Sequence, residues 1–267
     1  MKKLIGLDID GTLVNSKLEI TPKTKAALEK AQDLGHILVI ASGRAPHGVY
    51  RYAKELNFDK HNGLLSNFNG GRITNFQKKQ AIINHPLNFN LTKEILEFAE
   101  NLDIDYCLLN EGKIYSNKKN TYRLEESALK NNMEIVIREN LSYNLDFEVN
   151  NILFSQKEDR IDEPAKKLME KFGKITSQIK SMPYYYEIMP QNISKGRSLM
   201  EIAKYYGIDE KDTIAFGDEE NDISMIKMAG TGVVMANGSQ KVKELADYIT
   251  KSNDNDGIAY YLENFVF

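Results

Sequence analysis

The sequence predicts an α/β protein with a doubly wound parallel-sheet core, a Rossmann-like architecture, that carries an inserted α+β domain. Near the amino end, an apolar run at 4–7, a helical pattern at 22–34 and a second apolar run at 37–41 alternate in order. The last third of the chain repeats this alternation, whereas the middle does not. Strands that alternate with helices are typical of a parallel sheet covered on both faces.

The first third contains clear start and stop signals. Thr21 can cap a helix that Pro22 begins, and Gly35 ends it. The run that follows, 37–41, is apolar throughout, as expected for a strand buried on both faces. A second helix is predicted over 46–56. The order strand, helix, strand, helix indicates the start of a doubly wound sheet.

The carboxyl third is predicted to alternate in the same way. A helix starts at Ser194-Lys195-Gly196 and ends at Gly207, with apolar residues at helical spacing between them. The remaining predicted elements, in order, are a strand at 213–216, a helix through 225–228, a strand at 232–235 and a helix at 238–246.

The middle of the chain has a different pattern, which reads as helix, hairpin, helix, strand, helix and strands. Asn110-Glu111-Gly112 resembles a hairpin turn between two short strands. Prolines stand near both ends of this region. We therefore predict a core domain formed by 1–81 and 188–267, with an inserted α+β cap domain at 82–187.

Composition excludes several functional classes. Of 267 residues, 42% are hydrophobic and 27% charged, and the formal net charge is −3 with both signs well mixed. This balance indicates neither a nucleic-acid face nor a membrane-surface helix. The single cysteine, Cys107, lies in an apolar run and is expected to be buried. We expect a cytoplasmic protein that is a monomer or a weak homodimer.

The most informative residues are Asp8 and Asp10, which follow the first apolar run in Asp8-Ile9-Asp10-Gly11-Thr12. Alternation along a strand sends residues i and i+2 to the same side, so both carboxylates can share one site. Two adjacent carboxylates repel each other unless a proton or a cation neutralises them. A hard cation, Mg²⁺ above all, suits such oxygen ligands.

Three further segments follow predicted core strands or begin a core helix, and each has residues that suit phosphate chemistry. Ser42 and Gly43 offer a hydroxyl and a backbone N–H. Lys195 offers an ammonium. A third segment adds acidic and amide groups for a cation or the phosphate: Asp218, Asn221 and Asp222. In a parallel sheet these strand ends converge on one edge, where ligands bind.

These motifs resemble the haloacid dehalogenase (HAD) superfamily, and within it the Cof-type hydrolases (subclass IIB) with a large cap. The first motif is matched at 8–12, the second at Ala41-Ser42-Gly43-Arg44, the third at Lys195 and the fourth at 217–222. Glu187-Ile188-Met189-Pro190 and Asn69-Gly70 also match the Cof-type pattern. Gln191-Asn192 departs from it, because the family often has glycine at the second position.

The resemblance implies a Mg²⁺-dependent phosphatase that works in two steps. Asp8 attacks phosphorus to form an aspartyl-phosphate, and Asp10 protonates the leaving oxygen and then activates water. The implied ligands of Mg²⁺ are the Asp8 carboxylate, the Asp10 backbone carbonyl and Asp218, with Asp222 supporting them. The residues implied to bind the substrate are Ser42, Gly43, Arg44, Lys195 and Asn221.

The expected substrate is a small phosphorylated metabolite, a sugar phosphate first and a phosphorylated cofactor second. Two alternatives stay open on the sequence. One is a phosphoryl transferase or mutase that uses the same site. The other is a non-catalytic, metabolite-binding regulator with the same fold. An inserted domain facing the motif edge would close over the substrate and choose the leaving group.

Overall fold

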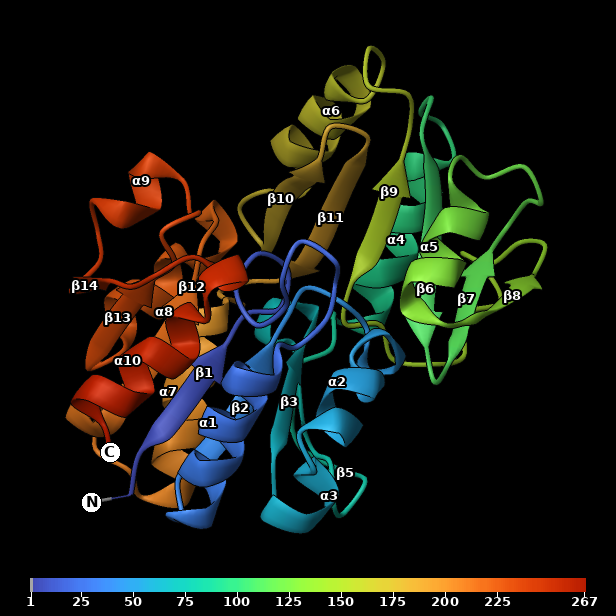
Figure 1. Ribbon diagram of the computed structural model, residues 1–267. Helices are drawn as coiled ribbons and strands as arrows, with labels where there is room; N and C mark the ends of the chain where they lie inside the picture. The colour runs from blue at the N-terminus through green and yellow to red at the C-terminus, as the bar shows by residue number, and fades with distance from the viewer. Residues whose placement is uncertain (1) are drawn as a thin grey trace. The chain divides into compact units, whose positions relative to one another are not determined.

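The computed structural model describes residues 2–267 of the chain, which divide into two compact units (Figure 1). The first unit comprises residues 2–43, Val49–Ile83 and Ser194–Phe267. The second comprises Arg44–Gly48 and Asn84–Ile193. Among these described residues, no helix is long and apolar enough to cross a membrane.

The first unit is built on an eight-stranded sheet in the order β14-β13-β12-β1-β2-β3-β4-β5. The strands of this sheet are β1 (Leu4–Leu7), β2 (Ile37–Ala41), β3 (Leu64–Asn67), β4 (Arg72–Asn75), β5 (Gln80–Asn84), β12 (Thr213–Gly217), β13 (Thr231–Val234) and β14 (Tyr248–Ile249). From β14 to β3 the pairing is parallel, and β4 then pairs antiparallel with β3.

Strand β1 occupies the point where the chain changes direction across the sheet. Leu7 pairs with Ile40 of β2 on one side and with Phe216 of β12 on the other. The chain passes from β1 to β2 and β3 in one direction and returns through β12, β13 and β14 in the other. The carboxyl ends of strands at such a switch point are where open α/β sheets bind ligands.

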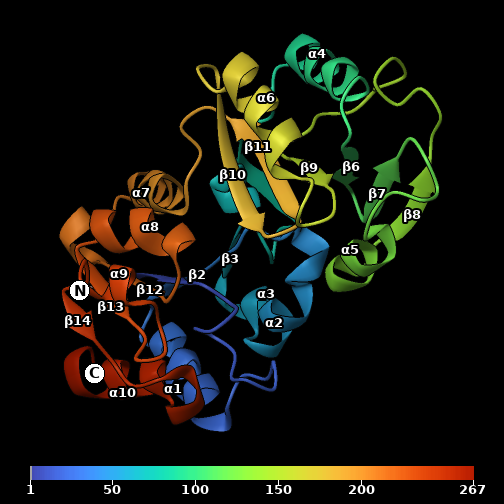
Figure 2. The same cartoon turned by 90° about the horizontal axis from the view of Figure 1, so that it is seen from above.

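Helices cover both faces of this sheet. They are α1 (Pro22–Asp33), α2 (Tyr50–Glu55), α3 (Phe58–His61), α7 (Lys195–Tyr206), α8 (Ile223–Met228), α9 (Gln240–Lys243) and α10 (Gly257–Phe265). Figure 2 shows α1 and α10 on the face opposite α7 and α8. Alternate strand residues enter the two apolar cores, so that Leu38 packs with α1 whereas Val39 packs with α7.

The helix start predicted at Thr21 and the helix end predicted at Gly207 are confirmed. Thr21 accepts a hydrogen bond from the Thr24 amide at the start of α1, and Gly207 ends α7 in the left-handed conformation. The single helix predicted over 46–56 is wrong: Pro46–Gly48 forms a 3-10 turn (η1), and α2 begins only at Tyr50. Gly48 has low helix propensity and interrupts the run. The helix predicted over 238–246 is confined to α9.

The second unit contains a six-stranded sheet in the order β10-β11-β9-β6-β7-β8. Its strands are β6 (Asp105–Asn110), β7 (Lys113–Ser116), β8 (Glu134–Ile137), β9 (Ile152–Ser155), β10 (Thr176–Met182) and β11 (Tyr185–Pro190). Its helices are α4 (Phe89–Ala99), α5 (Leu124–Asn131) and α6 (Asp162–Phe172). The hairpin predicted at 110–112 joins β6 to β7.

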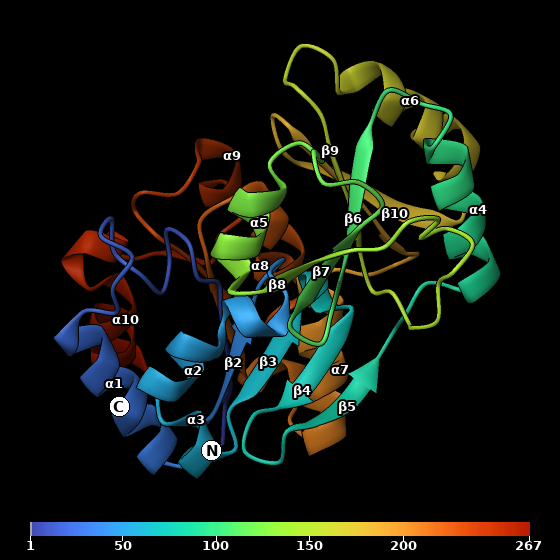
Figure 3. The same ribbon diagram turned by 90° about the vertical axis from the view of Figure 1, so that its right-hand side faces the viewer.

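The two faces of this second sheet are covered differently. Figure 3 shows α4 and α6 against one face, where they enclose the apolar core, while α5 lies on the other side. Because β11 continues to Pro190, the unit ends at Ile193, beyond the predicted boundary at 187. Arg44–Gly48 also contacts this unit, which the sequence does not indicate. The role of the unit as a cap stays a prediction.

Candidate active site

Asp8 is placed by the end of β1. The strand itself ends at Leu7, but the Asp8 amide still donates to the Phe216 carbonyl of β12 at 3.1 Å. The Leu13 amide donates to the Asp8 carbonyl at 3.1 Å, so the chain turns sharply after the carboxylate. Asp8 is buried, whereas Asp10, within the turn, is exposed. The two acids therefore have different environments although they are two residues apart.

Lys195 is the first residue of α7 and is 1% exposed. The Ser194 side chain caps this helix by accepting from the Arg197 amide. The Lys195 ammonium donates to Asp8 Oδ1 at 2.5 Å and to Asp222 Oδ1 at 2.7 Å. A fully buried cation is tolerated only when it is paired, and here two carboxylates hold it.

Asp218 and Asp222 come from the segment that follows β12. The Thr12 hydroxyl donates to Asp218 Oδ1 at 2.8 Å. Asp222 is fully buried, and its Oδ2 accepts from the amides of Asp218 at 3.0 Å and Glu219 at 3.2 Å. Asp222 thus links the end of β12 to Lys195, and both of its carboxylate oxygens accept hydrogen bonds.

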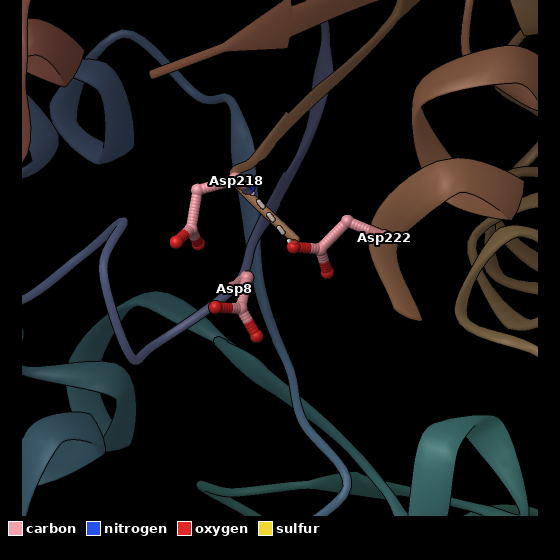
Figure 4. A group of neighbouring side chains, drawn as sticks. All are labelled: Asp8, Asp218 and Asp222. Atoms are coloured by element: carbon pink, nitrogen blue, oxygen red, sulfur yellow. Dashed lines mark hydrogen bonds between the residues drawn. The ribbon is translucent and has the colours of Figure 1, made fainter. Parts of the chain in front are cut away.

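The three buried carboxylates form a cluster that can hold a cation. One oxygen from each of Asp8, Asp218 and Asp222 lies within 4.8 Å of the others, and Figure 4 shows the three side chains side by side. Both oxygens of Asp222 already accept hydrogen bonds, whereas Asp8 and Asp218 each have one carboxylate oxygen outside the hydrogen bonds described above. Carboxylate oxygens at this density suit Mg²⁺.

The pKa values in the cluster reflect its crowding. Burial, reinforced by the negative charge of Asp222, raises the pKa of Asp8, although Lys195 opposes the shift. Burial likewise raises the pKa of Asp218 to about 6, with the Thr12 hydrogen bond opposing it. Burial disfavours the Lys195 ammonium, but Asp222 and Asp8 outweigh it and raise its pKa. The cluster therefore has surplus negative charge that a divalent cation would neutralise.

Glycines allow the backbone to approach this cluster closely. Gly11 has a φ of +81°, and a Cβ there would lie 2.2 Å from Asp218 Oδ2. A Cβ at Gly196, the second residue of α7, would lie 2.2 Å from the Ser224 carbonyl oxygen. A side chain at position 11 would displace the Asp218 carboxylate. A side chain at position 196 would displace the start of α7.

The other predicted site residues differ in burial and in the unit to which they belong. Ser42 is buried beyond the end of β2, with its amide donating to the Ser66 carbonyl at 2.9 Å, and Gly43 follows it. Asn221 is exposed in the 3-10 turn η4 (Glu220–Asp222). Arg44 belongs by its contacts to the second unit. The roles assigned to these residues stay predictions.

Thr12 is the site residue that the sequence reasoning missed. It lies in the motif that contains Asp8 and Asp10, but a threonine after glycine gives no separate signal. Only the fold brings its hydroxyl to Asp218, 206 residues away. Ser224, which accepts from the Gly196 amide at 3.1 Å, was missed for the same reason.

Comparison with known proteins identifies the family. Residues 5–262 match the model of the haloacid dehalogenase-like hydrolases. The chain belongs to this family. A haloacid dehalogenase-like hydrolase from Bacteroides thetaiotaomicron is similar over 98% of this chain and 99% of its own, with 32% identity and a TM-score of 0.91. The predicted Cof-type membership and α/β fold are thereby confirmed.

Named relatives add the enzyme class. A 5-amino-6-(5-phospho-D-ribitylamino)uracil phosphatase of Bacillus subtilis is 30% identical over 99% of this chain and 96% of its own length. The HAD subclass IIB sugar phosphatase BT4131 is 26% identical, with a TM-score of 0.80 and 99% of each chain covered. This HAD hydrolase is thus a phosphatase, as predicted.

Proposed function

We propose that this HAD hydrolase is a Mg²⁺-dependent phosphatase that cleaves a small phosphorylated metabolite, a sugar phosphate first, through an aspartyl-phosphate on Asp8. The observation that carries the proposal is the buried cluster in which Lys195 pairs with Asp8 and Asp222 beside Asp218. The similarity to a sugar phosphatase and to a phosphoribitylaminouracil phosphatase supports a phosphorylated polyol as substrate.

Asp8 is the proposed nucleophile. One carboxylate oxygen forms a bond to phosphorus while the bond from phosphorus to the leaving oxygen breaks. The Lys195 ammonium favours the ionised form of Asp8 and so opposes the burial that raises the pKa of this carboxyl. Lys195, Ser42 and the Gly43 N–H stabilise the negative charge on the transferring oxygens, and Asn221 and Arg44 contact the substrate.

Asp10 is the proposed acid and base. It donates a proton to the leaving oxygen in the first step. In the second, it accepts a proton from the water that attacks phosphorus, which releases inorganic phosphate and regenerates Asp8. Its exposure fits this role, because a group that exchanges protons twice per turnover must reach solvent or substrate.

The residues present fit a Mg²⁺ ion. Asp8 and Asp218 each keep one carboxylate oxygen outside the hydrogen bonds described above, and the Asp10 backbone carbonyl is the third proposed ligand. When bound, the ion supplies positive charge that neutralises the phosphate and the crowded carboxylates. Asp222 holds Lys195 and the backbone that positions Asp218.

The test of this proposal is phosphate release from a panel of phosphate esters, with and without Mg²⁺. The panel contains hexose phosphates, a phosphoribitylamino compound, pyridoxal phosphate, flavin mononucleotide and p-nitrophenyl phosphate. We expect Mg²⁺-dependent release that Asp8→Asn lowers on the order of 10³-fold or more. Metal-loaded wild-type protein that releases no phosphate from any ester would contradict the proposal.

Asp10→Asn separates the acid–base role of Asp10 from metal binding. Because the proposed metal contact is the backbone carbonyl, we expect turnover to fall by about 10²–10⁴-fold with nearly unchanged Mg²⁺ affinity. The measurements are steady-state kinetics and a calorimetric Mg²⁺ titration. An equal loss of Mg²⁺ affinity would show that the Asp10 side chain binds the ion.

A further inference from the structure

The residue that follows Asp10 is a glycine, Gly11, and it gives this part of the backbone unusual conformational freedom. Gly11 has a φ of +81°, and a Cβ there would lie 2.2 Å from Asp218 Oδ2, so the packing of the first unit requires glycine. Glycine has a larger range of backbone conformations than any other residue. Asp10, the proposed acid and base, is exposed beside it. A contact that fixes the Gly11 backbone therefore also restricts where the Asp10 carboxyl can point.

The peptide group between Gly11 and Thr12 is held at both of its ends. The Thr12 amide donates to the Ile9 carbonyl at 3.3 Å within the turn. At the other end, the side-chain amide of Asn237 donates to the Gly11 carbonyl at 2.8 Å. Asn237 lies 226 residues further along the chain, in the loop between β13 and α9. Its hydrogen bond restricts the rotation of a peptide group that the turn itself holds only through Thr12.

Asn237 is itself held in one orientation by a second asparagine. Its Oδ1 accepts from the Asn253 backbone amide at 3.0 Å, while its Nδ2 donates to Gly11. Exchanging the two ends of the Asn237 amide would place its oxygen against a carbonyl and its NH2 group against an N–H. The Asn253 side chain in turn donates to the Val14 carbonyl at 2.8 Å, and Val14 forms a parallel bridge with Asp10. The two asparagines thus bind the turn at two points.

The loop that contains Asn237 is also attached to the segment that contains Asp218. The Ser239 amide donates to the Asp218 carbonyl at 3.0 Å. A Cβ at Gly238 would lie 2.9 Å from the same carbonyl oxygen, so the loop and this segment are in close contact. Asn237 therefore connects the turn that contains Asp10 with the segment that contains Asp218, through a loop that contacts both.

We propose that Asn237 and Asn253 are positioning residues that hold the turn after β1 so that the Asp10 carboxyl is directed at the leaving oxygen. They act through the backbone and offset the conformational freedom of Gly11. A displacement of about 1 Å in a catalytic group is enough to lower a rate severely, so holding this turn matters for proton transfer. The catalytic part of this inference rests on the proposed phosphatase function, whereas the holding of the turn does not.

Hydrogen exchange followed by mass spectrometry tests whether Asn237 holds the turn, and it needs no catalytic activity. We expect Asn237→Ala to speed the exchange of amides in residues 9–16 about fivefold, because one hydrogen bond that stabilises their closed state is lost. Asn264→Ala is the matched control. This exposed asparagine of α10 donates to the Tyr260 carbonyl at 2.7 Å, so its variant should leave exchange at 9–16 unchanged. Unchanged exchange in Asn237→Ala would overturn the proposal.

The dependence on the leaving group tests whether the two asparagines act through Asp10. The alkoxide of a sugar phosphate needs a proton from an acid in order to leave, whereas p-nitrophenolate leaves with little help. For Asn237→Ala and Asn253→Ala we expect kcat/KM to fall about tenfold with the alkyl phosphate that wild-type protein cleaves fastest, and less than about threefold with p-nitrophenyl phosphate. Equal losses with both esters would make the asparagines structural residues only.

A double variant separates action through Asp10 from a general loss of structure. Asp10→Asn already lacks the acid, so adding Asn237→Ala should change its kcat/KM less than about twofold. A further tenfold loss would show that Asn237 acts elsewhere and would overturn the proposal. If wild-type protein releases no phosphate from any ester while exchange at 9–16 still rises in Asn237→Ala, the phosphatase proposal fails and the holding of the turn by Asn237 stands.

Discussion

Lys195 is the residue on which the geometry of the site depends most. Its ammonium is buried completely, and it connects the end of β1, through Asp8, with the segment after β12, through Asp222. The charge is stable there only because two carboxylates face it, and each carboxylate is stable there because of the lysine. Removing the lysine leaves both carboxylates buried without their counter-charge.

We therefore expect Lys195→Met to lower both activity and stability. The side chain keeps its approximate length, but Asp8 and Asp222 lose their counter-charge, which should lower the free energy of unfolding by about 3–5 kcal/mol. Urea unfolding in the absence of Mg²⁺ measures this. Lys204→Met, an exposed lysine on the same helix, is the control, and an equal loss there would refute the pairing argument.

Gly11 and Gly35 offer a matched pair of glycines for testing close approach. Both have positive φ, +81° and +86°, but a Cβ at Gly35 would meet nothing within 4 Å, whereas one at Gly11 would meet Asp218. Gly35→Ala should cost only backbone strain, about 1–2 kcal/mol. Gly11→Ala should also displace the Asp218 carboxylate and weaken Mg²⁺ binding. Calorimetric Mg²⁺ titration of both variants distinguishes the effects, and equal affinities would contradict the contact.

At the scale of single elements, α7 is the helix that places a positive charge, the Lys195 ammonium, in the site. Its apolar residues Leu199, Ile202 and Ala203 pack on the sheet, and its first residue is Lys195. Gly196 lets this end lie against the segment of α8. The helix therefore fixes the position of the ammonium through packing that occurs along its whole length.

The cap of α7 should contribute measurably to this placement. Ser194→Ala removes the side-chain acceptor for the Arg197 amide and should lower the free energy of unfolding by about 1 kcal/mol, with a smaller loss of kcat. Ser239→Ala is the control, because Ser239 precedes α9 in the same position without a side-chain cap bond. Thermal unfolding of both variants tests the prediction, which fails if their midpoints fall equally.

At the scale of the whole molecule, the carboxyl ends of β1, β2 and β12 bring segments separated by more than 200 residues to one edge of a sheet. The result is a cluster of acidic groups whose burial and mutual repulsion oppose folding. Their raised pKa values mean that the folded state binds protons that the unfolded chain releases.

The pH dependence of stability should reveal the effect of these raised pKa values. The pKa of Asp218 is raised from 3.8 to about 6, so its contribution to the free energy of unfolding is highest below pH 4 and is lost as pH rises toward 6. Excess Mg²⁺ should reverse the loss. Urea unfolding of metal-free wild-type protein and Asp218→Asn, compared at pH 4 to 7, isolates the effect. Parallel curves for the two proteins would argue against a raised pKa.

Much of the first unit could be predicted from sequence because its signals are local. Thr21-Pro22, Gly35 and Gly207 determine helix ends through backbone chemistry, and the apolar runs of β1 and β2 indicate strands buried on both faces. The predicted helix at 46–56 was wrong because its hydrophobic pattern continues across Gly48, where the backbone does not. Local pattern could not reveal that 44–48 packs with the second unit.

The sequence by itself determined the family, the alternation of strands and helices and the chemical character of Asp8, Asp10, Lys195 and Asp218. Each follows from short motifs and their order along the chain. Only the tertiary structure decided that both oxygens of Asp222 accept hydrogen bonds and that the Thr12 hydroxyl holds Asp218. Hydrogen bonds depend on distances between segments far apart in sequence, and only packing sets those distances.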